Sequence, residues 1–183
     1  MADALERRAS VVEVRAKGRR LEGYAAVFGE EARLGPVIET IRPGAFAASL
    51  AEKRDVLALV DHDMSRVLAR TRSGTLRIGE DSRGLPFDLD LPDTTAGRDV
   101  LALAERGDLG GASFAFRPRA GGEVRETGRR ILTAVDLFEI SVVQAFPAYE
   151  GTLVYARSGA GVSHAHEPRG VALTRAWLDT VGR

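Results

Sequence analysis

Apolar and polar residues alternate along several short segments of the chain, and this alternation predicts β-strands. Residues 85–91 give the clearest case, because Phe87, Leu89 and Leu91 alternate with two aspartates. Successive side chains of a strand point to opposite faces of a sheet, so this spacing predicts a strand with one buried face. Further strands are predicted over residues 10–16, 20–29, 55–60, 67–71, 75–81, 112–119 and 131–146.

Glycines and polar residues between these segments predict how the strands connect. Gly18 lies between residues 10–16 and 20–29, which predicts a β-hairpin with its turn at that glycine. Residues 67–91 hold three strand segments separated by short polar turns, and this succession predicts an antiparallel meander. Residues 121–130 are polar and contain glycines, so they predict a second hairpin region.

Two segments within this β-rich region predict helices. Phe46 and Leu50 are four residues apart, which places them on one face of a short helix. A second helix is predicted to begin after Thr94 or Thr95, because a threonine side chain can cap the first free N–H groups. Gly107 is expected to end this helix.

These elements predict one domain with a tail at each end. The domain spans residues 10–156, and residues 1–9 are expected to be a flexible N-terminus. Residues 157–183 are expected to be a flexible tail, rich at first in glycine, serine and alanine, with a possible short helix over 171–181. The predicted fold class is mainly β with a few helices (α+β), as a largely antiparallel closed or partly open β-barrel.

The composition excludes several classes of function. Lys plus Arg and Asp plus Glu number 26 each, so net charge favours neither nucleic acid nor an anionic membrane as partner. The chain has no cysteine, which excludes thiol catalysis and disulfides. It has no apolar run of about 20 residues that could span a bilayer. Its glycine pairs lack the motifs of nucleotide-binding loops, so no cofactor is expected.

His62 is the only histidine of the predicted domain. It follows an apolar strand and lies between Asp61 and Asp63. An imidazole titrates near neutral pH and therefore suits general-base chemistry. A surface histidine in a charged turn fits the same residues. His164 and His166 lie in the tail without a third ligand in view, so a solvated linker is favoured there over a metal site.

Ser113 is the candidate nucleophile. It follows Gly110, Gly111 and Ala112, small residues that leave backbone N–H groups near its hydroxyl open to a ligand. A serine hydroxyl is a weak nucleophile unless a neighbouring base activates it. A structural serine in a helix-to-strand turn is the alternative interpretation of this segment.

Glu139 is the candidate acid, because it lies in a strand segment with apolar residues on both faces. A carboxylate buried there must be paired, hydrogen-bonded or protonated, and orienting a catalytic imidazole would satisfy it. A structural ion pair with an arginine would satisfy it equally. Strict alternation puts Glu139 on one face with Val135, Leu137 and Val143, and Phe138, Ile140 and Val142 on the other.

Five ordered segments together resemble the prohead (capsid maturation) protease family of tailed double-stranded DNA phages, which is related in fold to the herpesvirus assemblins. The resemblance covers about residues 21–155, and the histidine, serine and acid segments are among its blocks. The matching segments are residues 21–28 (LEGYAAVF), 39–46 (ETIRPGAF), 59–63 (LVDHD), 110–116 (GGASFAF), and 138–143 (FEISVV) with 147–149 (PAY).

This resemblance implies a herpesvirus-protease-like fold and a serine endopeptidase with Ser113 as nucleophile, His62 as base and Glu139 as third member. Asp61 and Asp63 remain rivals for the acid, as does Asp136. The resemblance also implies a setting inside the assembling procapsid, in the cytoplasm of the bacterial host. The implied substrates are the scaffold segment of the major capsid protein, a separate scaffold, and the chain's own tail. Activation by dimerisation or higher assembly would fit the assemblin likeness.

Two other classes of function stay open. A catalytically silent β-barrel that binds capsid or scaffold chains as an assembly factor would retain the same fold. A small-ligand-binding barrel is compatible with the apolar strands, although no polar cluster marks a pocket. The oxyanion donors are assigned only to backbone N–H groups near Ser113 or within residues 139–150.

Overall fold

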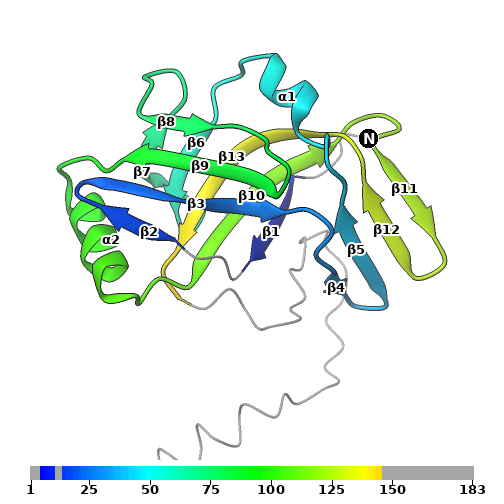
Figure 1. The fold of residues 1–183 in the computed structure, drawn as a ribbon, viewed down its shortest axis with the longest axis horizontal. Coiled ribbons are helices and arrows are strands. Elements are labelled where there is room, and N and C mark those ends of the chain that lie inside the picture. The colour runs from blue at the N-terminus through cyan, green and yellow to red at the C-terminus, as the bar shows by residue number, and fades with distance from the viewer. Residues whose placement is uncertain (1–4, 11–13, 146–183) are drawn as a thin grey trace, which may run out of the picture.

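The computed structural model describes residues 5–10 and 14–145 (Figure 1). These residues form thirteen strands and two helices, so the predicted mainly β, α+β class is confirmed. The strands are distributed over one five-stranded and two four-stranded sheets. Among the described residues, no helix has the length and apolar character needed to cross a membrane.

The five-stranded sheet carries the candidate catalytic residues. Its strands pair antiparallel, except that β13 and β6 are parallel. β1 lies at one edge, so residues 6–10 form a paired strand although most of them belong to the segment expected to be flexible. In spatial order the strands are β1 (Glu6–Ser10), β10 (Gly111–Pro118), β13 (Val135–Val143), β6 (Leu57–Val60) and β7 (Asp63–Arg70).

The second sheet is antiparallel throughout and contains the predicted hairpin. Gly18 has a φ of 62° at its turn, a left-handed conformation that glycine adopts without a side-chain clash. The predicted meander over residues 67–91 is wrong in one respect, because β7 pairs with β6 in the five-stranded sheet and only the last two strands pair here. In spatial order the strands are β2 (Arg15–Lys17), β3 (Arg20–Val27), β9 (Gly84–Asp90) and β8 (Leu76–Ile78).

The third sheet explains why residues 131–146 do not form one strand. The N–H groups of Thr133 and Ala134 both donate to the Gly122 carbonyl, at 2.8 and 3.0 Å. A Cβ on Gly122 would lie 2.1 Å from the Ala134 carbonyl oxygen, so this close approach requires glycine. The contact separates β12 from β13. In spatial order the strands are β11 (Glu123–Glu126), β12 (Arg129–Leu132), β5 (Val37–Ile41) and β4 (Ala32–Leu34).

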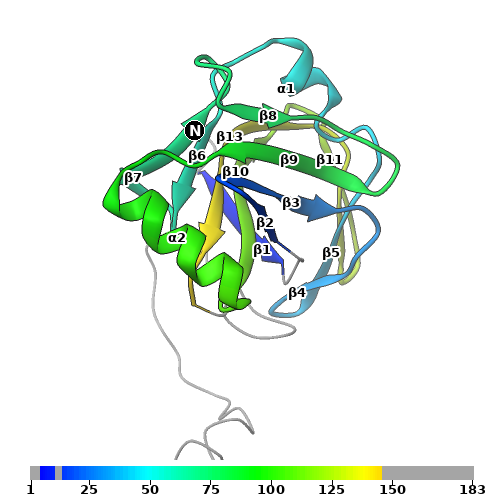
Figure 2. The same ribbon diagram turned by 60° about the vertical axis from the view of Figure 1, so that its left-hand side comes forward.

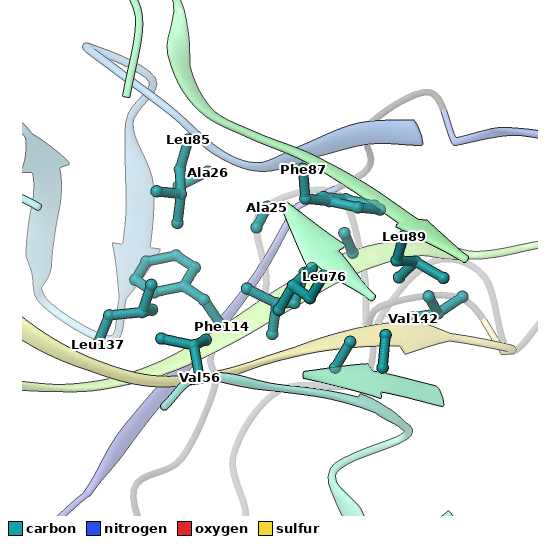
Figure 3. Packing of buried hydrophobic residues seen from close by; sticks show 14 of the residues in the cluster. Ala25, Ala26, Val56, Leu76, Leu85, Phe87, Leu89, Phe114, Leu137 and Val142 are labelled. Carbon is teal, nitrogen blue, oxygen red and sulfur yellow. The ribbon is translucent and has the colours of Figure 1, made fainter. Parts of the chain in front are cut away.

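The main core lies between the five-stranded sheet and the second sheet. Figure 3 shows Leu85 of β9 above Phe114 of β10, and Leu89 of β9 beside Val142 of β13. Phe114 also meets Phe46 edge to face, with ring centroids 5.5 Å apart. Burying each large side chain of this kind contributes about 1.5–3 kcal/mol, so this core holds β10 firmly in place.

The two helices lie where the sequence predicted them. Helix α1 (Ala47–Ala51) follows the buried Phe46. Helix α2 (Thr95–Arg106) begins after Thr94, whose hydroxyl accepts a hydrogen bond from the Gly97 N–H at 3.2 Å, and ends at Gly107 with a φ of 75°. Figure 2 shows α2 beside the strands at one end of the sheets, where it contacts β2 and β7.

The described strands do not close into a barrel, so that part of the prediction is not confirmed. β3 lies close to β10 and β1, whereas its ladder partners are β2 and β9. The pairing in the five-stranded sheet ends at β1 on one side and at β7 on the other. The predicted tail over residues 157–183 lies outside the described residues.

Candidate active site

Three neighbouring strands position the candidate catalytic residues. Ser113 lies on β10 opposite Ser141 of β13, and Glu139 lies opposite Ala115. Val60, the last residue of β6, lies beside Val142 of β13, so the turn that follows β6 passes next to these side chains. His62 belongs to this turn.

The turn holds His62 in an uncommon backbone conformation. Asp61 and His62 have φ values of 49° and 60°, in the left-handed region that few residues other than glycine occupy. The Asp61 N–H donates to the Val142 carbonyl at 3.0 Å, and the His62 N–H donates to the Ser141 hydroxyl at 3.1 Å. The Gln144 N–H in turn donates to Asp61 Oδ1 at 2.9 Å. These bonds to β13 and the residue after it stabilise a turn that would otherwise be strained.

The structure brings Ser113, His62 and Glu139 into one chain of hydrogen bonds. His62 Nε2 lies 2.8 Å from Ser113 Oγ, and His62 Nδ1 lies 2.5 Å from Glu139 Oε1. The Ser141 hydroxyl donates to the other carboxylate oxygen of Glu139 at 2.7 Å. A serine, an imidazole and a carboxylate in this order form the arrangement that activates a hydroxyl for attack on an acyl group.

A β-bulge places Leu137 and Glu139 on different faces of the sheet. The register between β10 and β13 shifts between Ala115 and Phe116. Strict alternation, which placed Leu137 on the face of Glu139, is therefore wrong. Leu137 packs in the hydrophobic core together with Ile140, whereas Glu139 contacts His62. An extra residue in one strand of a pair interrupts the alternation, so Leu137 and Glu139 point to opposite faces although they are two residues apart.

The members of this site are withdrawn from solvent to different degrees. Ser113 is 1% exposed and Glu139 is 5% exposed, whereas the His62 side chain is 17% exposed. Glu139 is thus buried, as expected from its apolar neighbours. The hydroxyl of Ser113 also donates to the Arg8 carbonyl of β1 at 2.7 Å, so the edge strand contacts the candidate nucleophile.

The three rival aspartates have other partners. Asp61 accepts from the Gln144 N–H, and Asp63 Oδ1 accepts from the N–H and hydroxyl of Ser65. Asp136 lies 2.6 Å from an Nη2 of Arg119. Of the four carboxylates considered, Glu139 is the one found within hydrogen-bonding distance of the His62 ring.

Ser141 is a contributor that the sequence interpretation did not identify. It is 1% exposed and contacts both the Glu139 carboxylate and the His62 backbone. The signal was available, because residues two apart on a strand share a face and Ser141 follows Glu139 at that spacing. Its hydroxyl orients the carboxylate and also holds the turn that carries the imidazole.

Two of the backbone donors considered for an oxyanion site are already engaged. The Gly110 N–H donates to the Val143 carbonyl at 2.8 Å, and the Gln144 N–H donates to Asp61. The described part of the chain contains no cluster of three or more His, Asp or Glu side chains that could hold a metal ion. His164 and His166 lie outside the described residues.

A mainly β protein with a serine, a histidine and a glutamate in one hydrogen-bonded chain has the form of a serine hydrolase. Residues 5–165 match the family model of the caudovirus prohead serine protease. The match covers most of the 183 residues, so the chain belongs to this family of serine peptidases, as its sequence segments predicted. Comparisons with curated proteins and with solved structures gave no match.

Proposed function

We propose that this protein is the serine endopeptidase of procapsid maturation, with Ser113 as nucleophile, His62 as general base and Glu139 as the orienting acid. The observation that carries the proposal is the continuous contact from Ser113 Oγ through both ring nitrogens of His62 to Glu139. Membership of the prohead serine protease family supports it independently.

The geometry supports a two-step hydrolysis. Ser113 Oγ attacks the scissile carbonyl carbon while His62 Nε2 takes the hydroxyl proton, and this proton then passes to the departing amine. The resulting ester between Ser113 and the acyl part of the substrate is hydrolysed by water, again with His62 as base. Glu139 accepts the Nδ1–H of the ring, which leaves Nε2 free to receive a proton and stabilises the imidazolium that forms.

The proposed substrates follow from the family. They are the scaffold segment of the major capsid protein or a separate scaffold. Cleavage takes place inside the procapsid while it assembles in the cytoplasm of a bacterial host. Cleavage of the chain's own tail belongs to the same proposal. An intact mass that is identical for active protein and for Ser113→Ala would count against cleavage of the tail.

Co-expression with the major capsid protein of the same phage tests this function. Wild type is expected to shorten the capsid protein, as read from its intact mass, and Ser113→Ala or His62→Ala should abolish shortening. Ser82→Ala is the matched control, because Ser82 is an exposed turn serine. Shortening that survives in Ser113→Ala would refute the mechanism. If no variant shortens the capsid protein, the silent assembly factor becomes the better interpretation.

A serine-directed fluorophosphonate separates the same two functions without a capsid substrate. An activated Ser113 should form a covalent adduct that mass spectrometry places on this residue. His62→Ala should lose the adduct, because the hydroxyl then lacks its base.

A further inference from the structure

Strand β1 covers the candidate nucleophile. It pairs antiparallel with β10, with Ala9 opposite Ser113 and Arg8 opposite Phe114. It is the edge strand on this side of the five-stranded sheet (Figure 1). Ser113 lies 1% exposed beneath it and donates its hydroxyl to the Arg8 carbonyl at 2.7 Å. An extended peptide thus already occupies the β10 edge, with one of its carbonyl groups at the nucleophile.

This contact opposes catalysis. A serine hydroxyl has a single proton. While Ser113 donates that proton to the Arg8 carbonyl, it cannot donate the same proton to His62 Nε2, which is the transfer that activates it. Removal of β1 would therefore both uncover Ser113 and return its proton to the base.

The side chain of Arg8 shows what the vacated edge would bind. It is buried, and its guanidinium makes a two-pronged contact with Glu39 of β5, Nε to Oε1 at 2.5 Å and Nη2 to Oε2 at 2.8 Å. The guanidinium carbon also lies 5.2 Å from the centre of the Phe116 ring. A planar cation above an aromatic ring and against a carboxylate is the geometry that favours arginine over other side chains.

Glu39 needs a cation at this position. It is 1% exposed, and among the described residues its other bonded cation is Arg130, which contacts Oε2 at 2.8 Å. Without Arg8, Oε1 would lose the partner it has among the described residues, and a buried carboxylate with an unmatched oxygen is strongly unfavourable. A strand that replaces β1 would therefore be selected for a basic side chain in the same place.

We propose that β1 occupies the place of the substrate strand, and that Glu39 selects a basic side chain in the substrate at the position Arg8 holds. This inference rests on the proposed function and adds the substrate class to it. The resting chain is covered by its own edge strand, and a substrate strand with arginine or lysine at this position displaces it.

The rate of fluorophosphonate labelling of Ser113 in the full chain tests whether β1 covers the site. Arg8→Ala is expected to label at least about tenfold faster than wild type, because the buried ion pair that holds β1 is lost. Arg7→Ala is the matched control, since Arg7 is the neighbouring residue of the same type with an exposed side chain. Equal rates for Arg8→Ala and Arg7→Ala would overturn the proposal.

A reversible tether gives the same test without weakening the fold. Arg7 and Ala115 are register partners, and paired residues of an antiparallel sheet lie within the Cα separation of a disulfide. The chain contains no other cysteine. In the Arg7→Cys, Ala115→Cys chain, labelling should be at least about tenfold slower when oxidised than when reduced. Equal rates in the two states would overturn the proposal.

Peptide binding tests the selection by Glu39 and does not depend on catalysis. A fluorescent peptide Leu-Glu-Arg-Arg-Ala-Ser, the sequence around Arg8, is titrated against the full chain carrying Arg8→Ala and Ser113→Ala. It should bind at least about tenfold more tightly than versions with leucine or glutamate in place of its second arginine. A further Glu39→Gln change should reduce this preference below about threefold.

The outcomes distinguish this inference from the proposed function. Equal binding of the arginine, leucine and glutamate peptides would overturn the selection by Glu39, whatever the chain hydrolyses. Selective peptide binding, together with chains that retain Ser113 and His62 but neither cleave the capsid protein nor label, would uphold the binding site and refute the endopeptidase.

Discussion

Two buried polar clusters lie on opposite faces of the β1–β10 pair, and they differ in the partners of their carboxylates. The catalytic cluster consists of Ser113, His62, Glu139 and Ser141, and its carboxylate contacts an imidazole and a hydroxyl. In the charge cluster every carboxylate contacts an arginine. Its members are Glu6, Arg8, Glu39, Glu123 and Arg130.

This difference in partners suits the catalytic cluster to proton transfer and the charge cluster to binding charged groups. Burial acts to raise the pKa of Glu6, but hydrogen bonds from Arg130 and Arg8 outweigh it and hold the pKa below its usual value. Burial likewise acts to lower the pKa of Arg130, and its bonds to Glu6 and Glu123 outweigh this and raise it. These shifts favour the charged forms of Glu6 and Arg130. An imidazole can exchange a proton near neutral pH, so only the catalytic cluster suits proton transfer.

Among changes that keep both Ser113 and His62, the largest effect is expected from Glu139→Gln. An amide can present an N–H to His62 Nδ1 and so favour the wrong ring tautomer, which in triads of this kind costs on the order of ten-thousandfold in rate. The rate of capsid-protein shortening measures it. Asp63→Asn also changes a carboxylate to an amide next to His62 in the chain and should stay close to wild type, because Asp63 bonds to Ser65 of its own strand. A similar loss in both variants would contradict the assignment.

Arg130→Met should disrupt the charge cluster and lower the free energy of unfolding. Arg130 belongs to the charge cluster and not to the catalytic cluster. It leaves Glu6 and Glu39 without a cation they now share, and removing one partner of a buried ion pair costs about 3–5 kcal/mol in the free energy of unfolding. Denaturant unfolding measures this loss. Arg125→Met removes an exposed arginine that pairs with Glu123 and should cost at most about 1 kcal/mol. Equal losses in the free energy of unfolding for the two variants would mean that the buried ion pairs of Arg130 contribute no more to stability than an exposed pair.

Ser141→Ala should weaken catalysis through positioning. A hydrogen bond to a charged group contributes about 1.5–3 kcal/mol, which corresponds to a fall in kcat of roughly ten- to a hundredfold. KM should change by less than about threefold, because Ser141 acts through Glu139 and His62. Ser141→Thr retains the hydroxyl and should recover most of the rate. Failure of threonine to restore the rate, with a matching loss of folded protein, would indicate a structural role alone.

The smallest effect concerns an ion pair outside both clusters. Hydrogen bonds from Arg70 and from the Arg72 backbone lower the pKa of Asp55 to about 2. Because this folded-state pKa lies below the unfolded one of about 4, Asp55 stabilises the fold above about pH 4, and this contribution disappears as the pH falls toward 2. The difference in Tm between wild type and Asp55→Asn should follow this course. A difference that persists undiminished at pH 2 would exclude the charge as its cause.

The sequence predicted the local elements well, because their signals are local. Period-two alternation identified β9, and a threonine cap with a terminal glycine identified α2. Glycine in the turn identified the β2–β3 hairpin. Where a segment was ambiguous from its own residues, as with the polar Glu6–Ser10, the pairing strand β10 made it a strand. The paired residues are more than a hundred positions apart in the sequence, so no local pattern of residues predicts this pairing.

By itself, the sequence determined a mainly β protein and its family, and it predicted Ser113 and His62 as nucleophile and base, with Glu139 as one of several candidates for the acid. Residue type and neighbouring segments are sufficient for these inferences. Only the tertiary structure decided that Glu139 rather than an aspartate faces His62, because the pairing of β13 with β6 and β10 brings this carboxylate beside the turn that carries the imidazole. It also placed β1 over Ser113 and Arg8 against Glu39. Register and bulges depend on contacts between distant strands, and these exist only once the chain has folded.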